Sequence, residues 1–314
     1  MRERLAGLGP VSSMGLAVAF LLLLATGVVL LLRRIRPAAD YSELAARVKS
    51  WWLMAAVFFA AIAAGAPAAH AFFAFVSFWA LKEFITLLKT RPVDHGGLVW
   101  CFLSIPVQYF FVATDRYGMF IIFIPVYLFL LLPIRLVLAR ETAGFVASAS
   151  QLQWGLMAFV FGLSHLAFLL NFPRLAHTPA DGRTLLIFVV FVAEISDVLQ
   201  YVWVKMIGGP KVIPSVSPNK TWAGFLGGAA SAVAVSLLLR FLTPFSVGET
   251  VVVSLLITLA GFFGGAVMSA VKRDFGVKEF GRLIPGHGGI VDRIDSLCYA
   301  GPLFFHFVRY FHYR

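Results

Sequence analysis

The chain has 314 residues, of which 60% are hydrophobic and 13% are charged, and its mean hydropathy is +0.89. This composition excludes a soluble globular protein and is typical of a polytopic membrane protein. The net charge of +11 does not indicate nucleic acid binding here, because the basic residues lie in short segments between apolar runs, where they set topology and attract anionic headgroups or phosphorylated substrates.

About ten apolar stretches have the length of a membrane span, which is about 20 residues. The first is longer than a signal-peptide core and ends in Arg33 and Arg34, so we expect it to be retained. The third is interrupted by Lys82 and Glu83, and the fourth is short. We predict an all-α, polytopic helical bundle of about ten transmembrane helices, within a range of nine to eleven. The predicted spans are 14–32, 51–69, 71–88, 98–114, 117–137, 152–170, 184–204, 222–242, 250–271 and 296–311.

The basic residues are concentrated in alternate loops. Of the 26 Lys and Arg residues, 18 lie in segments 33–50, 82–97, 135–151, 205–221 and 272–295. The positive-inside rule therefore predicts that these loops are cytoplasmic, that both termini lie outside and that the number of spans is even. An error of one span among the first three would move only the N-terminus.

The chain shows no soluble domain, long linker or internal repeat, so we expect one integrated bundle. Residues 1–180 are interpreted as a lipid-facing scaffold and residues 181–314 as the catalytic region, with cytoplasmic loops 205–221 and 272–295. Cys101 and Cys298 lack the spacing of a metal site and are expected to be packing residues. Glycines at helical spacing in two consecutive spans predict that those spans pack backbone to backbone; they are Gly224, Gly227 and Gly228, then Gly261, Gly264 and Gly265.

The first polar loop, 215–224, leads into the eighth predicted span. Pro218 cannot lie inside a helix, and Thr221 is a suitable N-cap. Ser217, Lys220 and the free amides of the following helix would then converge where a phosphate is favoured. The alternative is an ordinary helix cap with Trp222 anchored at the membrane interface.

The second polar loop, within 269–297, carries five cations and four carboxylates. Lys272, Arg273 and Lys278 suit the charge of a polyphosphate. Asp292 and Asp295, three residues apart, would face one side of a helix and could hold a hard divalent cation. The Pro-Gly-His-Gly-Gly sequence at 285–289 predicts a sharp turn that lets a nucleotide or metal approach the main chain. Alternatively, the cations only set topology and the Asp–Arg pairs neutralise each other.

Two carboxylates are predicted inside the membrane. Glu194 and Asp197, together with Gln200, share one face of the seventh span. Such groups cost several kcal/mol unless they face a cavity, a cation or a partner. Glu194 is open to a structural hydrogen bond, whereas Asp197 is better interpreted as a metal ligand or nucleotide contact.

These motifs resemble those of the phosphatidate cytidylyltransferases, or CDP-diacylglycerol synthases, over roughly residues 190–300. The chain departs from that family's pattern at Glu279, where aspartate is usual, and at Ala223, where glutamate is frequent, so it resembles a divergent branch. The family's preceding aspartate corresponds to Asp197. The residues that carry the resemblance are Ser217, Pro218, Lys220, Thr221 and Gly224, then Ser269, Lys272, Arg273, Lys278, Pro285, His287, Gly288, Gly289, Asp292, Arg293 and Asp295.

The resemblance implies that CTP and phosphatidic acid, or a related lipid phosphate, give a CDP-lipid and pyrophosphate. It implies catalytic roles for Asp292, Lys272, Arg273, Lys278 and His287, of which we expect His287 to bind phosphate or fix the loop rather than act as a base. Substrate would be bound by Ser217, Lys220, Thr221, Arg293, Gly288 and Gly289. Mg²⁺, or another divalent cation, would be held by residues among Asp292, Asp295, Asp197 and Glu279.

The same resemblance implies a bacterial inner membrane location, an active site facing the cytoplasm, where CTP is found, and a homodimer. Two other readings remain open. One is a cytidylyltransferase for a different membrane lipid phosphate. The other is a non-catalytic lipid or ion transporter in which Glu194 and Asp197 line an ion path.

Overall fold

The computed structural model describes residues 9–89, 91, 94–138, 140–175, 178 and 180–313. In this part of the chain, eight helices are long and apolar enough to cross a membrane, and two shorter ones, α11 and α14, lie at the eighth and tenth predicted spans. The all-α membrane bundle is therefore confirmed, and the protein is an integral membrane protein. The spans are α2 (Pro10–Ile35), α3 (Ser42–Ala63), α4 (Ala66–Leu87), α5 (His95–Ala113), α6–η2–α7 (Tyr117–Ile122, Phe123–Leu128, Phe129–Val137), α8–η3–α9 (Phe145–Gly155, Leu156–Gly162, Leu163–Leu169), α10 (Gly182–Ile207), α11 (Trp222–Leu238), α12 (Val247–Asp274) and α14 (Leu297–His312).

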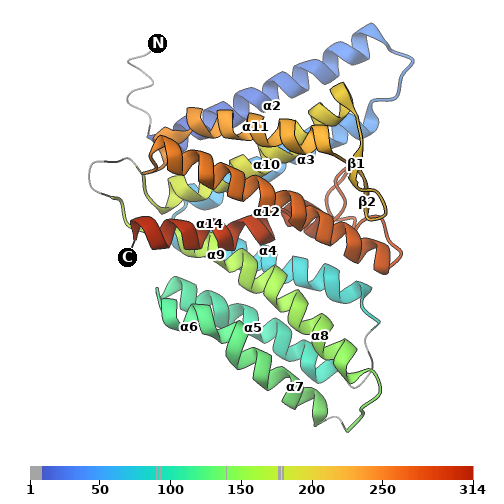
Figure 1. The fold of residues 1–314 in the computed structure, drawn as a ribbon, viewed down its shortest axis with the longest axis vertical. Coiled ribbons are helices and arrows are strands. Elements are labelled where there is room, and N and C mark those ends of the chain that lie inside the picture. The colour runs from blue at the N-terminus through green and yellow to red at the C-terminus, as the bar shows by residue number, and fades with distance from the viewer. Residues whose placement is uncertain are drawn as a thin grey trace.

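The spans differ widely in how deeply they are buried. The α8–η3–α9 span is enclosed over most of its length, whereas α2 is almost entirely exposed and projects along one side of the molecule (Figure 1). Phenylalanine rings from distant spans meet in the core, where Phe120 and Phe168 both pack edge-on against Phe305 of α14. Because lipid, not water, surrounds the bundle, the exposed apolar face of α2 needs no protein cover.

A short β-hairpin, which the sequence analysis treated as a loop, connects α10 to α11. Strands β1 (Lys211–Ile213) and β2 (Ser217–Thr221) pair antiparallel, with Lys211 opposite Thr221. Gly208 and Gly209, at φ of 68° and 95°, turn the chain back after α10, a conformation that favours glycine. The predicted N-cap is confirmed, since the Thr221 hydroxyl accepts a hydrogen bond from the Gly224 amide at 3.1 Å.

The glycines expected to join α11 to α12 instead face other partners. A Cβ atom at Gly227 would lie 2.5 Å from the Trp203 ring of α10, and one at Gly228 would lie 2.3 Å from the Gln200 side chain of the same helix. On α12, a Cβ at Gly264 would lie 2.8 Å from the carbonyl oxygen of Asp295. Helices α11 and α12 do pack against each other, as predicted, but the nearest neighbours of these three glycines lie on α10 and in the segment after α13. Helical spacing of small residues defines a close-packing face but not the helix that it meets.

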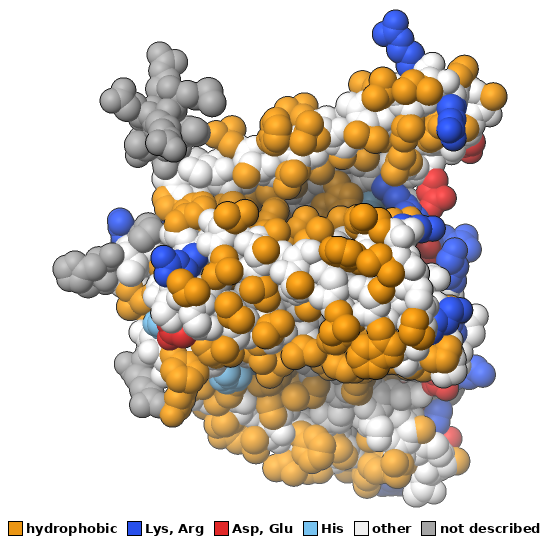
Figure 2. Space-filling model, turned by 45° about the horizontal axis from the view of Figure 1, so that its top comes forward, with side chains coloured by type: hydrophobic (Ala, Val, Ile, Leu, Met, Phe, Trp, Pro, Cys, Tyr) orange, Lys and Arg blue, Asp and Glu red, His pale blue; other side chains and the backbone are white. Residues whose placement is uncertain are grey.

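The loops in which Lys and Arg are concentrated lie together at one end of the bundle. Figure 1 shows the hairpin, the C-terminal end of α12 and the connection from α7 to α8 at this end. In the space-filling view, Lys and Arg side chains gather along the same edge (Figure 2). We call this region, formed by loops 33–50, 82–97, 135–151, 205–221 and 272–295, the basic end.

Candidate functional site

The loop between α12 and α14 is folded by a glycine-dependent turn and a short helix, α13 (Val291–Ile294). Gly286 and Gly288 have φ of 75° and 79°, which favours glycine. The Ile284 amide donates to the Gly288 carbonyl at 2.8 Å, and the His287 amide donates to the Ile284 carbonyl at 2.9 Å. The sharp turn predicted at 285–289 is therefore confirmed.

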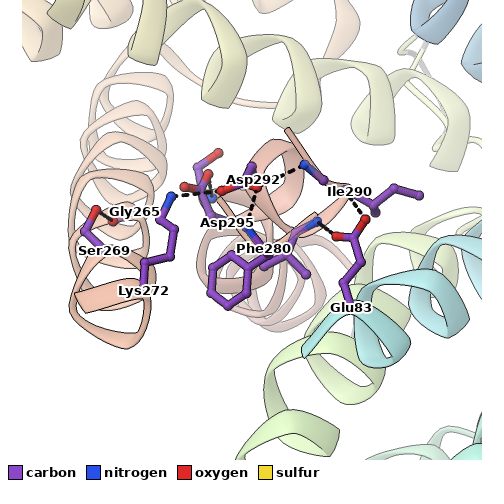
Figure 3. Close-up of polar contacts among 11 residues, drawn as sticks. Glu83, Gly265, Ser269, Lys272, Phe280, Ile290, Asp292 and Asp295 are labelled. Atoms are coloured by element: carbon purple, nitrogen blue, oxygen red, sulfur yellow. Dashed lines mark hydrogen bonds and ion pairs between the residues drawn. The ribbon is translucent and has the colours of Figure 1, made fainter. Parts of the chain in front are cut away.

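Asp292 binds both ends of this loop (Figure 3). Its Oδ1 pairs with Lys272 Nζ at 2.9 Å, and its Oδ2 accepts the amides of Phe280 and Gly289 at 2.9 and 3.0 Å. A Cβ at Gly288 would lie 2.8 Å from the same Oδ2. Charge-assisted hydrogen bonds of this kind are stronger than neutral ones. Lys272 and Asp292, both predicted site residues, thus pair with each other and fix the loop.

Helices α3 and α4, which the sequence analysis assigned to the scaffold, also hold the loop. Glu83 of α4 accepts the amides of Ile290 and Val291, each at 3.0 Å. The Ser50 hydroxyl of α3 donates to the Pro285 carbonyl at 2.8 Å, and Arg47 Nε donates to the Gly286 carbonyl at 3.1 Å. In the sequence, Glu83 stood out only as an interruption of a predicted span. A buried carboxylate in an apolar helix was the available signal.

A second group of charged side chains forms where β2, α12 and the segment after α13 meet. Lys220 Nζ donates to the Phe262 carbonyl at 2.9 Å and lies 4.2 Å from the centre of the Phe262 ring. A Cβ at Gly265 would lie 3.3 Å from Lys220 Nζ and 3.6 Å from Asp295 Oδ2, so both side chains lie beside this glycine.

Burial and charge act against each other on these two residues. Burial lowers the pKa of Lys220 below 10.5, and the carboxylates of Asp197 and Asp295 oppose that shift. Burial raises the pKa of Asp295 above 3.8, against the effect of Lys272 and Arg293. The Ser296 amide donates to Asp295 Oδ1 at 2.8 Å.

Helix α10 adds two carboxylates to this group. Glu194 lies within electrostatic reach of Asp197, Asp295 and Arg293, and Asp197 within reach of Lys220 as well. Among the described residues, no cation lies within 4.0 Å of Glu194, Asp197 or Asp295. All three are partly accessible. We call Glu194, Asp197, Lys220, Arg293 and Asp295 the charged cluster. It unites two regions of sequence that were predicted to cooperate.

The remaining predicted residues lie around the loop surface. Arg273, Lys278 and Glu279 are exposed, with the Glu279 side chain 3.2 Å from where a Cβ of Gly288 would be. Ser217 is half-buried at the start of β2.

His287 is buried with its ring edge-on to Trp51, 5.9 Å between centres. Its Nδ1 has no hydrogen-bond partner within the described ranges. Burial and the charge of Arg293 lower its pKa below 6.5, so the ring is neutral at pH 7.

The sequence is similar to that of known proteins over most of its length. A model of the cytidylyltransferase family matches residues 45–311. The chain is 39% identical over 292 residues to the uncharacterized protein YnbB of Escherichia coli strain K12, which covers 92% of this chain and 95% of that protein.

Two named enzymes match over shorter stretches. The phosphatidate cytidylyltransferase of Brucella abortus is 44% identical over 127 residues, 40% of this chain and 47% of that protein. The phosphatidate cytidylyltransferase of Staphylococcus saprophyticus is 33% identical over 157 residues, 49% of this chain and 60% of that protein. These matches thus span about half the length of the named enzymes.

Proposed function

The chain belongs to the cytidylyltransferase family, and we propose that its lipid acceptor is phosphatidic acid, which it converts with CTP to CDP-diacylglycerol and pyrophosphate. Family membership makes it a CTP-dependent nucleotidyltransferase, and the names of the two phosphatidate enzymes that match part of the chain support a lipid phosphate as the acceptor. The observation that supports the proposal is the charged cluster, in which the side chains of Lys220 and Asp295 both lie beside Gly265 at the basic end. At this end of the bundle, the cluster could contact both a charged lipid headgroup and a water-soluble nucleotide.

The chemistry requires little acid–base work from the protein. A phosphate oxygen of phosphatidic acid attacks the α-phosphorus of CTP, and the bond from this phosphorus to the oxygen bridging to the β-phosphate breaks. Pyrophosphate leaves with the electron pair of that bond. Because the attacking oxygen is already ionised near neutral pH, the protein must mainly neutralise two anions and align them.

The cations of the site divide into buried and exposed groups. Lys220 and Arg293, inside the charged cluster, would bind the transferring phosphate and the leaving pyrophosphate. Arg273 and Lys278, exposed on the loop, would attract the triphosphate from water. Ser217 would contact a phosphate, and Thr221, already engaged as N-cap, would hold Lys220 in place through the backbone.

The carboxylates fit a divalent cation held jointly with substrate. Asp197 and Asp295 are neighbouring like charges, and in the described part of the chain no group of three acidic, His or Cys residues forms a complete metal cage. Mg²⁺ suits such a pair, since it is commonly bound by one or two carboxylates together with substrate phosphates. When bound, it would offset the charge that develops on the triphosphate.

The contacts of Asp292 and His287 favour positioning roles. Asp292 uses both oxygens on Lys272 and two loop amides, so Asp197 and Asp295 are the better candidates for the cation. Neutral His287 would donate or accept a hydrogen bond rather than supply charge. Gly288 and Gly289 allow the carboxylates of Asp292 and Glu83 to approach the main chain.

The side of the membrane that the site faces and the identity of the lipid acceptor are supported by different observations. The basic end carries the segments that the positive-inside rule assigns to the cytoplasm, which supports a site facing the cytoplasm of a bacterial inner membrane. A different membrane lipid phosphate is a second candidate acceptor, because the identity to the named phosphatidate enzymes spans less than half of this chain.

A panel of lipid phosphates distinguishes these acceptors. The purified protein in nanodiscs would be given labelled CTP, Mg²⁺ and one lipid at a time, including phosphatidic acid and an isoprenoid phosphate. The proposal predicts that label enters the phosphatidic acid product fastest. Faster labelling of another lipid would reassign the acceptor, and no labelling of any lipid would contradict the proposed reaction.

A further inference from the structure

Glu83 lies 207 residues before Ile290, the first loop residue whose amide it binds, in a helix outside the charged cluster. We propose that Glu83 is a positioning residue for catalysis: its carboxylate fixes the beginning of α13 and thereby the placement of Arg293 and Asp295. The effect on turnover rests on the proposed function, whereas the structural effect does not.

The geometry is that of a fork holding two consecutive amides (Figure 3). Glu83 Oε1 accepts the Ile290 amide and Oε2 accepts the Val291 amide, both at 3.0 Å. Glu83 is only 8% exposed, and within the described ranges no Lys or Arg nitrogen lies within 4.0 Å of its carboxylate. Burying a carboxylate without a counter-ion is costly unless hydrogen bonds satisfy it. The loop amides are therefore its direct partners.

Two glycines of the loop, one before and one after the His287 turn, make space for the Glu83 carboxylate. A Cβ at Gly289 would lie 2.3 Å from Oε2, and one at Gly281 would lie 2.6 Å from Oε1. Gly289 does not have a positive φ, so its own backbone conformation does not call for glycine. The close approach of Glu83 accounts for the missing side chain at this position.

Glu83 acts on the charged cluster through a run of consecutive amides. Asp292 accepts a hydrogen bond from the Gly289 amide, and Glu83 accepts hydrogen bonds from the amides of Ile290 and Val291. Two carboxylates thus fix three successive residues. Arg293 and Asp295 follow within about one helical turn. A displacement at 290–291 would therefore change how Asp295 faces Lys220, which lies on a different segment.

Three variants test this assignment. Glu83→Gln keeps the size of the side chain but turns its NH₂ group toward a backbone N–H. Glu83→Asp keeps the charge but is shorter by one methylene. Thr86→Ala is the control: this exposed residue lies on the same helix, and among the described residues its side chain bonds only the carbonyl of Lys82 in its own helix.

Hydrogen exchange measures the loop, and pyrophosphate release measures turnover. We expect Glu83→Gln to speed exchange of the amides in a peptide covering 288–296 by about ten- to hundredfold, since hydrogen bonds to charged groups are strong. The kcat should fall by a similar factor, while the KM for CTP and exchange in α10 and α12 change little. Glu83→Asp should show a smaller loss, and Thr86→Ala none.

Unchanged exchange at 288–296 in both Glu83 variants would overturn the assignment. So would global loss of protection, which would make Glu83 a residue for bundle stability. Failure of the proposed function is distinguishable, because the wild-type protein would then release no pyrophosphate while the exchange measurement still gave its answer.

Discussion

Lys272 Nζ lies 2.9 Å from Asp292 Oδ1, and this ion pair closes the loop that separates the two residues in the chain. The pair is largely buried, with side-chain exposures of 18% and 4%. Since the other oxygen of Asp292 receives two loop amides, one carboxylate joins the end of α12, the middle of the loop and the start of α13. The loop is thus held by a charge pair of its own in addition to the contacts from α3 and α4.

Breaking this pair should disable the enzyme. Asp292→Asn removes the charge that neutralises Lys272 and one of the hydrogen-bond acceptors of the loop. Removing one partner of a buried pair costs about 3–5 kcal/mol, so turnover should fall by at least about a hundredfold. Pyrophosphate release is the measurement. Arg282→Gln, an exposed change in the same loop, should retain activity. Full turnover by Asp292→Asn would contradict the role given to the pair.

The divalent cation should depend on the charged cluster rather than on the exposed loop. Asp295→Asn and Asp197→Asn should each raise the Mg²⁺ concentration needed for half-maximal activity by at least about tenfold, because each removes a hard oxygen ligand with its charge. Glu279→Gln should leave that concentration unchanged, since Glu279 is exposed beside Gly288. A large increase for Glu279→Gln with no increase for the two Asp variants would instead assign the cation to the loop.

Alkaline pH should weaken CTP binding through Lys220. Burial lowers the pKa of this ammonium below 10.5, although Asp197 and Asp295 oppose the shift. The charged form is therefore present at low pH and is lost, as pH rises, earlier than from an exposed lysine. The KM for CTP should rise along this alkaline limb. In Lys220→Met the KM should be high and independent of pH in the same range. An unchanged alkaline limb in Lys220→Met would assign the titration to another group.

Glu83 and Gly289 should be coupled. Gly289→Ala alone should slow turnover, because its Cβ would lie 2.3 Å from Glu83 Oε2. In a Glu83→Ala background the same change should cost far less, since the obstructing carboxylate is gone. A double-mutant cycle on kcat should therefore give a coupling of about 1 kcal/mol or more between these contacting residues. Additive effects would show that Gly289 is needed for some other reason.

Much of the fold was predictable because lipid imposes a simple rule on helix length and composition. The ten predicted spans correspond to helices, although α3 begins at Ser42 rather than at residue 51. That difference arises because its first two turns are polar and lie at the basic end, where Arg47 and Ser50 bind the loop. The β-hairpin was missed because five strand residues with a proline carry almost no periodic signal.

The site was predictable only where charge interrupted apolar sequence. Lys220, Asp197 and Asp295 were identified in this way, and the structure brings them together. The partners of these residues could not be predicted, because the spacing of residues within one helix does not reveal which distant helix they contact. Asp292 and Asp295 illustrate the limit: although three residues apart, one holds the loop and the other faces Lys220.

The most direct test is CTP-dependent pyrophosphate release by the purified protein in nanodiscs that contain phosphatidic acid and Mg²⁺. The wild-type protein should release pyrophosphate in equal amount to the CDP-diacylglycerol formed, and only when CTP and the lipid are both present. Asp295→Asn should release almost none. Release without lipid product, or equal release by wild-type protein and Asp295→Asn, would contradict metal-assisted cytidylyl transfer at the charged cluster.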